Sequence, residues 1–225
     1  DIIFIQNNLK ADGYYFTEIT TSKLVNDQLN SVKLTMNINL GEKAKIKKIN
    51  FIGNKKIKDR KLLKIIASEE HKFWKFISNK VYLNESIINL DKRLLENYYK
   101  NLGFYKVKVL DSFAEFNKEG FFELIFNIDA GDEYYFNDLR LNLPDDYDRS
   151  DFKKIEDIFK KLKDEKYSID NLNKILNEID KVASASLYDF INAQVEETII
   201  DNNKIDFTFN VSDSEKFYVE KINIL

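Results

Sequence analysis

Apolar and polar residues alternate in three separate segments of the chain, at 32–40, 122–128 and 205–211. Alternation with a period of two predicts strands with one face on a core and the other in solvent. Each segment follows a further expected strand across a polar turn, and these strands lie at 15–22, 105–116 and 190–199. The pattern therefore predicts three β-hairpins.

Helical patterns precede the second and third hairpins. Apolar residues recur at steps of three and four, which is typical of one helix face. The members are Leu83, Ile87, Leu90, Leu94 and Tyr98 in one segment, and Ile169, Leu172, Ile175, Leu176 and Ile179 in the other. A shorter helix is expected before each, at 58–68 and 150–162, and a strand before that, at 45–52 and 134–143. The order strand, helix, helix, strand, strand indicates an α+β fold, with a three-stranded sheet covered on one face by two helices.

The same unit is repeated along the chain. Two pairs of glycines share a spacing of 90 residues (103 − 13 and 131 − 41): Gly13 with Gly103, and Gly41 with Gly131. A third copy lies 83 residues further on, where residues 209–211 (Phe-Asn-Val) match residues 126–128 (Phe-Asn-Ile). Self-similarity at a long, nearly fixed period indicates one supersecondary unit used several times.

Composition excludes several classes of protein. The 35 Lys and Arg residues nearly balance 38 Asp and Glu residues, so the net charge of −3 excludes a strongly basic nucleic-acid binder. A hydrophobic content of 44% excludes a disordered chain. Cysteine is absent and His71 is the only histidine, which leaves no basis for a disulfide, a thiolate metal site or a histidine-rich zinc centre. Because phosphate-binding glycine motifs are absent as well, we expect no cofactor, no metal and no catalytic site. Nothing resembles a signal peptide at the start, so we expect an excised fragment.

Three short motifs carry a resemblance to a known family. They are the strand end 49–54 (Ile-Asn-Phe-Ile-Gly-Asn), the helix–strand junction 98–105 (Tyr-Tyr-Lys-Asn-Leu-Gly-Phe-Tyr) and the segment 128–134 (Ile-Asp-Ala-Gly-Asp-Glu-Tyr). These motifs, together with the order strand, helix, helix, strand, strand, resemble the POTRA domains of BamA-like outer-membrane protein assembly factors. One departure is that residues 185–188 (Ala-Ser-Leu-Tyr) replace the glycine at the equivalent junction of the next unit.

The resemblance implies a division into domains. Residues 1–44 would be the C-terminal part of one POTRA domain, 45–131 a complete domain and 132–214 another. Residues 215–225 would be the first strand of a following domain.

The resemblance also implies a function. The chain would be a non-catalytic interaction scaffold on the periplasmic face of the bacterial outer membrane, in a factor that inserts β-barrel proteins. Its partners would be unfolded outer-membrane β-barrel proteins, accessory assembly lipoproteins, neighbouring POTRA domains and a C-terminal membrane β-barrel outside this segment, with no nucleic acid. Two alternatives remain open: the POTRA arm of a related secretion or translocation transporter, and an enzyme that uses surface carboxylates.

The candidate binding site is the second strand of the complete domain, which is the usual edge strand of the POTRA fold. An edge strand offers unpaired N–H and C=O groups that bind an extended chain whatever its sequence. We expect Val107 and Val109 to point inward and Lys106 and Lys108 outward. The predicted client-binding residues are Tyr105, Lys106, Val107, Lys108, Val109 and Leu110. Edge lysines also protect against aggregation, so they fit a purely structural role equally well.

Other residues carry weaker predictions. Phe73, Trp74 and Phe76 form an aromatic cluster in a polar loop, which is either a partner-binding knob or a pin against the helices. Four residues are expected to be structural turn positions: Gly53, Asn54, Gly103 and Gly131. Asn84 is expected to cap a helix, and His71 to lie in a solvated loop.

Overall fold

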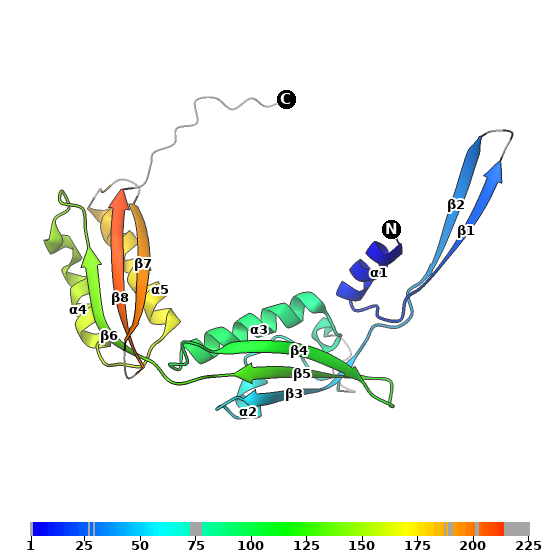
Figure 1. Cartoon of the computed structure of the whole chain (residues 1–225), viewed down its shortest axis with the longest axis horizontal. Helices are drawn as coiled ribbons and strands as arrows, with labels where there is room; N and C mark the ends of the chain where they lie inside the picture. The colour runs from blue at the N-terminus through cyan, green and yellow to red at the C-terminus, as the bar shows by residue number, and fades with distance from the viewer. Residues whose placement is uncertain are drawn as a thin grey trace. The chain divides into compact units, whose positions relative to one another are not determined.

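The computed structural model describes residues 2–26, 28, 30–72, 78–186, 188, 191–200 and 203–213 of the 225. The chain divides into two compact units, shown in Figure 1: the first takes residues 1–98 and 107–130, the second 99–106 and 131–225. The helices are α1 (Ile2–Ala11), α2 (Asp59–Leu62), α3 (Glu85–Lys100), α4 (Lys153–Leu162) and α5 (Ile169–Ala185). The 3₁₀ turns are η1 (Asn79–Val81) and η2 (Arg149–Phe152). The strands are β1 (Glu18–Asn26), β2 (Ser31–Asn39), β3 (Ile46–Asn54), β4 (Lys108–Phe116), β5 (Phe122–Asp129), β6 (Tyr135–Asn142), β7 (Ile191–Ile200) and β8 (Lys204–Asp213).

The first unit contains a three-stranded sheet in the order β3-β5-β4. The central strand β5 is parallel to β3 and antiparallel to β4. Its alternating residues Leu124, Phe126 and Ile128 are completely buried, and so are Leu62 of α2 and Leu95 of α3. The helices therefore bury the apolar face that the alternation predicted.

The second unit repeats this arrangement, with the strand order β6-β8-β7. In Figure 1, α4 and α5 lie behind these three strands. Phe207 and Phe209 of β8 are completely buried together with Phe152, Ile155 and other members of the same core. The α+β fold of two helices on a three-stranded sheet is confirmed in both units.

The hairpin β1–β2 is an exception to the expected burial. These two strands form a sheet of their own within the described residues. All nine residues of β2 are exposed, including Val32 at 55%, Leu34 at 57% and Ile38 at 45%. The prediction of strands was right, but the prediction of one face on a core was wrong for this copy, because the described residues supply no third strand beneath it.

Two predicted helices differ from the structure. The helix expected at 58–68 is only one turn of α2, because the chain then turns and the N–H groups of Ala67 and Ser68 donate to the carboxylate of Asp91 on α3 (2.5 and 3.2 Å). Burial raises the pKa of Asp91 above its ordinary value, although these hydrogen bonds oppose the shift. The helix expected at 150–162 opens as the 3₁₀ turn η2 before α4 begins.

Three of the four expected turn residues have a positive φ. Gly53, Gly103 and Gly131 have φ values of 84°, 101° and 65°, which favour glycine. Asn54 does not share this conformation; the next positive φ is that of Lys56, at 47°. Asn84 caps α3 as expected, since its side-chain oxygen accepts a hydrogen bond from the N–H of Ile87 at 3.0 Å.

Candidate strand-binding edge

Strand β4 is the open edge of the first sheet. The opposite edge, β3, is covered by hydrogen bonds from its own unit. The N–H of His71 donates to the carbonyl of Ile46 at 2.7 Å, and the carboxylate of Glu70 accepts from the N–H of Ile49 at 3.2 Å. Further along, the ammonium of Lys55 donates to the carbonyl of Phe51 at 2.8 Å. Only β4 therefore offers a long free edge in the described part of this sheet.

The hydrogen bonds of β5 show which of its backbone groups face β4. The N–H of Phe122 donates to Lys45 and that of Ala130 donates to Asn54, so the even-numbered residues of β5 face β3. Successive residues of a strand direct their backbone groups to opposite sides. The odd-numbered residues, including Glu123 and Ile125, consequently face β4.

The register then identifies the outward groups of β4. Phe113 lies opposite Ile125 and Glu115 opposite Glu123, so these two residues of β4 pair inward. Ser112 and Ala114 alternate with them and direct their N–H and C=O groups away from the sheet. These two residues carry the free hydrogen-bonding groups at the middle of the edge.

A bulge limits the open edge at its beginning. The register shifts between Val109 and Asp111, which leaves Leu110 as the extra residue, 57% exposed. The N–H of Val109, which points outward in the same phase, donates to the carboxylate of Glu96 on α3 at 2.9 Å. Glu96 thus occupies the first outward donor, and the accessible part of the edge begins after Leu110.

A groove of about 470 Å³ lies between β4 and α3. Ser112 and Ala114 form part of one wall, and Ile88 and Lys92 of α3 form part of the other. Because serine and alanine are small, they leave room between the strand and the helix. Tyr15 also lines the groove. Burial, and to a lesser extent the charge of Glu85, raises the pKa of the Tyr15 hydroxyl.

The structure separates the predicted edge residues into different groups. Val107 and Val109 are buried, at 4% and 9% exposure, while Lys106 and Lys108 are exposed, as expected. The strand begins at Lys108, however, so the expected start at residue 105 was wrong. Lys106 and Val107 precede the strand instead of forming its edge.

Tyr105 belongs to a different environment. Its ring lies 5.0 Å from that of Tyr167 and 5.6 Å from that of Tyr134, all in the second unit. Its hydroxyl donates to the carboxylate of Glu197. Burial and this carboxylate raise the pKa of Tyr105 to about 12. Tyr105 therefore packs in an aromatic cluster of the second unit and is not part of β4.

Sequence reasoning missed the residues that shape the groove. Ser112 and Ala114 are small residues at alternate positions of a strand, and that spacing is the signal that could have identified them. Glu96 could not be found in this way, because its contact with Val109 depends on how α3 lies against β4. The proposed knob of Phe73, Trp74 and Phe76 lies outside the described residues.

The described residues contain no group of three or more His, Cys, Asp or Glu side chains that could hold a metal ion. Among the same residues, every helix is too short or too polar to cross a membrane.

Residues 44–131 match the family model described as "POTRA: Surface antigen variable number repeat". The outer membrane protein assembly factor BamA of Neisseria meningitidis serogroup B is 22% identical over 91% of this chain and 26% of its own length. BamA of Neorickettsia risticii is 22% identical over the whole chain and 31% of its own length. The chain thus spans less than a third of these relatives.

The crystal structure of the Haemophilus influenzae BamA POTRA3-5 segment is similar in fold, with a TM-score of 0.57. It is 16% identical, and the similarity covers 93% of this chain and 77% of that one. The two units of our structure have the strand order and the helix layer of this fold. Residues 44–131 thus match the POTRA family model, and the chain as a whole is similar to tandem POTRA domains of BamA proteins.

Proposed function

We propose that this chain is part of the periplasmic scaffold of an outer-membrane protein assembly factor, and that β4 binds extended segments of unfolded client proteins. The observation that carries the proposal is the free edge at Ser112 and Ala114, beside a groove lined by the same residues. Backbone pairing at a sheet edge recognises an extended chain without requiring a particular sequence. That property suits clients whose strands share alternation but no common sequence.

The groove adds a second source of affinity. A client strand that pairs with β4 directs alternate side chains toward α3. Apolar side chains can then enter the groove, where Leu124 and Phe122 form part of the lining. We expect weak and broad binding, because a few main-chain hydrogen bonds contribute about 0.5–1.5 kcal/mol each.

Proline substitutions test the role of the backbone. Proline removes a backbone N–H and is tolerated best at strand edges. Ser112→Pro and Ala114→Pro each remove an outward donor, and we expect the double variant to bind a barrel-strand peptide about tenfold more weakly or worse. The matched controls are Ser112→Ala, which keeps the donor and should keep the affinity, and Phe113→Pro, which removes an inward donor and should destabilise the sheet.

Peptide titrations followed by backbone amide NMR shifts provide the measurement. Shifts along 111–116 that disappear in the folded double-proline variant would support the proposal. Undiminished binding by that variant would contradict it, as would shifts restricted to the outer face of α3.

The rest of the functional proposal follows from the BamA relatives. We propose that the complete protein also contacts accessory assembly lipoproteins and neighbouring POTRA domains, and that a membrane β-barrel follows in the longer protein. The domain division at 44/45, 131/132 and 214/215 is part of this proposal.

The aromatic cluster of Phe73, Trp74 and Phe76 remains a proposed binding surface for a partner protein.

A further inference from the structure

The second unit has an edge that is closed at one end and open further along. This edge is the outer side of β6, which pairs with β8 alone among the described strands. At its start, the N–H of Phe136 donates to the carbonyl of Glu165 and the N–H of Asp164 donates to the carbonyl of Phe136, both at 2.9 Å. The register of β6 against β8 then shifts between Phe136 and Leu139.

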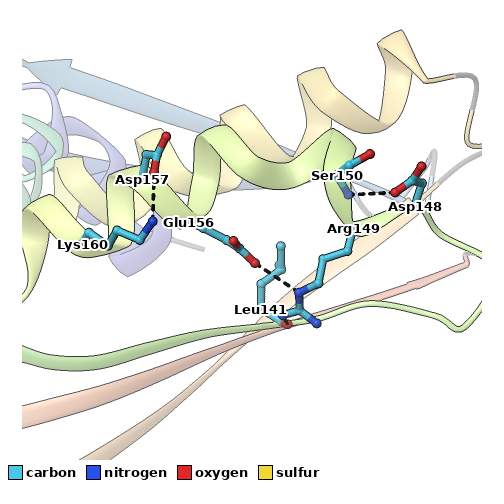
Figure 2. A network of polar contacts seen from close by, with 7 residues as sticks. All are labelled: Leu141, Asp148, Arg149, Ser150, Glu156, Asp157 and Lys160. Atoms are coloured by element: carbon cyan, nitrogen blue, oxygen red, sulfur yellow. Dashed lines mark hydrogen bonds and ion pairs between the residues drawn. The ribbon is translucent and has the colours of Figure 1, made fainter.

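Beyond the shift, Arg149 identifies the outward residues of β6. Its guanidinium donates to the carbonyl of Leu141 at 3.1 Å, as Figure 2 shows, so this carbonyl faces away from β8. Residues two apart on a strand direct their backbone groups to the same side. The N–H and C=O groups of Leu139 therefore also face outward.

Comparison with the first unit shows what is missing at Leu139. Ile49 and Phe51 of β3 lie 90 residues before Leu139 and Leu141 (139 − 49 and 141 − 51). The carbonyl of Phe51 is capped by Lys55, as that of Leu141 is by Arg149. The N–H of Ile49 is capped by a glutamate side chain, whereas no side chain in the described part of the second unit accepts from the N–H of Leu139.

A groove of about 630 Å³ lies along this edge, between β6 and α4. Its apolar lining comes from Leu139, Leu141, Leu143 and Phe159. A second hollow of about 220 Å³ shares Leu139 and Phe159 with it and extends to Lys163. The groove thus combines an apolar floor with a backbone donor that faces outward and has no side-chain acceptor among the described residues.

The charged groups from the helix side are mostly basic. Arg149, Lys160 and Lys163 line these hollows, and the only helix-side acid in their lining is Glu156, which already accepts from Arg149 at 3.1 Å. On the strand side, Arg140 and Asp138 also line them and pair with each other at 2.6 Å. In Figure 2, Glu156 extends from α4 toward β6 and meets Arg149 there. Lys160 pairs with Asp157, but its side chain is 75% exposed, so it can exchange this partner for another carboxylate at little cost.

We propose that the groove between β6 and α4 binds an extended segment of a partner protein in which apolar and acidic side chains alternate. The partner backbone pairs with the N–H and C=O groups of Leu139. Its apolar side chains pack on Leu141 and Phe159, and its carboxylates pair with Lys160 and Lys163. This site differs from the β4 edge in its location and in its selectivity, because the basic residues favour acidic segments.

The test uses the full 225-residue chain and two synthetic peptides of about nine residues, one alternating valine and glutamate and the other valine and lysine. We expect the acidic peptide to shift the amide signals of residues 139–143 and α4. Lys160→Glu combined with Lys163→Glu should weaken binding about tenfold or more, and added salt should weaken it as well. Lys153→Glu combined with Lys161→Glu, an equal charge change at two exposed residues of α4 that do not line the groove, should leave it within about twofold.

A separate variant tests whether the peptide pairs with the backbone of β6. Leu139→Pro removes the outward N–H and should reduce binding of the acidic peptide, while the β4 variant with proline at Ser112 and Ala114 should retain it. Equal affinity for the two peptides would overturn the proposal, as would equal losses with the Lys153/Lys161 pair and the Lys160/Lys163 pair. Shifts confined to β4 would also overturn it and assign the peptide to the other edge.

Discussion

Leu34 and Leu124 occupy the same position in two copies of the repeated hairpin, 90 residues apart (124 − 34). Leu34 on β2 is 57% exposed, and Leu124 on β5 is completely buried. Both strands alternate apolar and polar residues, and both pair antiparallel with the strand before them. The two leucines differ only in what lies against their hairpins.

The difference shows that alternation specifies a strand and a potential core face, but not a core. Strand β5 has a third strand beside it and helices over its apolar face, whereas the described residues give β2 only its hairpin partner. A two-stranded hairpin by itself is marginally stable in water. We propose that residues 1–44 need further elements of their own domain, as the proposed domain division implies.

The largest expected difference is in the cooperativity of unfolding when residues 45–131 and residues 1–44 are studied as separate segments. Residues 45–131 carry all five elements of one unit, so as an isolated segment they should unfold cooperatively with a free energy of about 5 kcal/mol or more. Residues 1–44 should show no cooperative transition. Thermal and urea melts followed by circular dichroism measure both. A gradual, non-cooperative melt of 45–131 would show that the proposed boundaries are wrong.

Matched leucine truncations provide the next test. Leu124→Ala removes buried methyl groups and leaves a cavity, so we expect the free energy of unfolding of the first unit to fall by about 2–5 kcal/mol. Leu34→Ala changes an exposed side chain and should alter it by about 0.5 kcal/mol or less. Amide hydrogen exchange of β5 in the full chain reports both effects. A large loss with Leu34→Ala would show that β2 packs on a core in solution.

A smaller effect is expected where β3 joins the second hairpin. Gly53 has a φ of 84°, and an added Cβ would lie 2.5 Å from the carbonyl oxygen of Ile128. Gly120 has nearly the same φ, 85°, with no atom within 4 Å of such a Cβ. Both alanine variants carry backbone strain of about 1 kcal/mol, but Gly53→Ala adds a backbone clash and should cost about 1–2 kcal/mol more.

Urea melts of the two variants measure this difference. Equal losses would mean that β3 moves away from β5 without penalty, and the close approach of the third strand would then contribute little to burial of Leu124.

The candidate binding edge was predictable only in part. The inward orientation of Val107 and Val109 follows from alternation, and the choice of the second strand of the domain follows from the resemblance to POTRA domains. The bulge at Leu110 and the displacement of Tyr105 to the aromatic cluster with Tyr167 were not predictable. Both depend on residues far apart in the sequence.

The type and order of the elements follow from the sequence alone, because periods of two and of three to four residues reflect the local geometry of strands and helices. The turns follow from it as well, such as that at Gly103, where a positive φ favours glycine. Which apolar faces are covered and which strand edges stay open depends instead on how the elements pack together. Burial of Leu124, the hydrogen bond from Val109 to Glu96 and the outward-facing N–H of Leu139 each depend on neighbours from other elements, and no local sequence pattern encodes them.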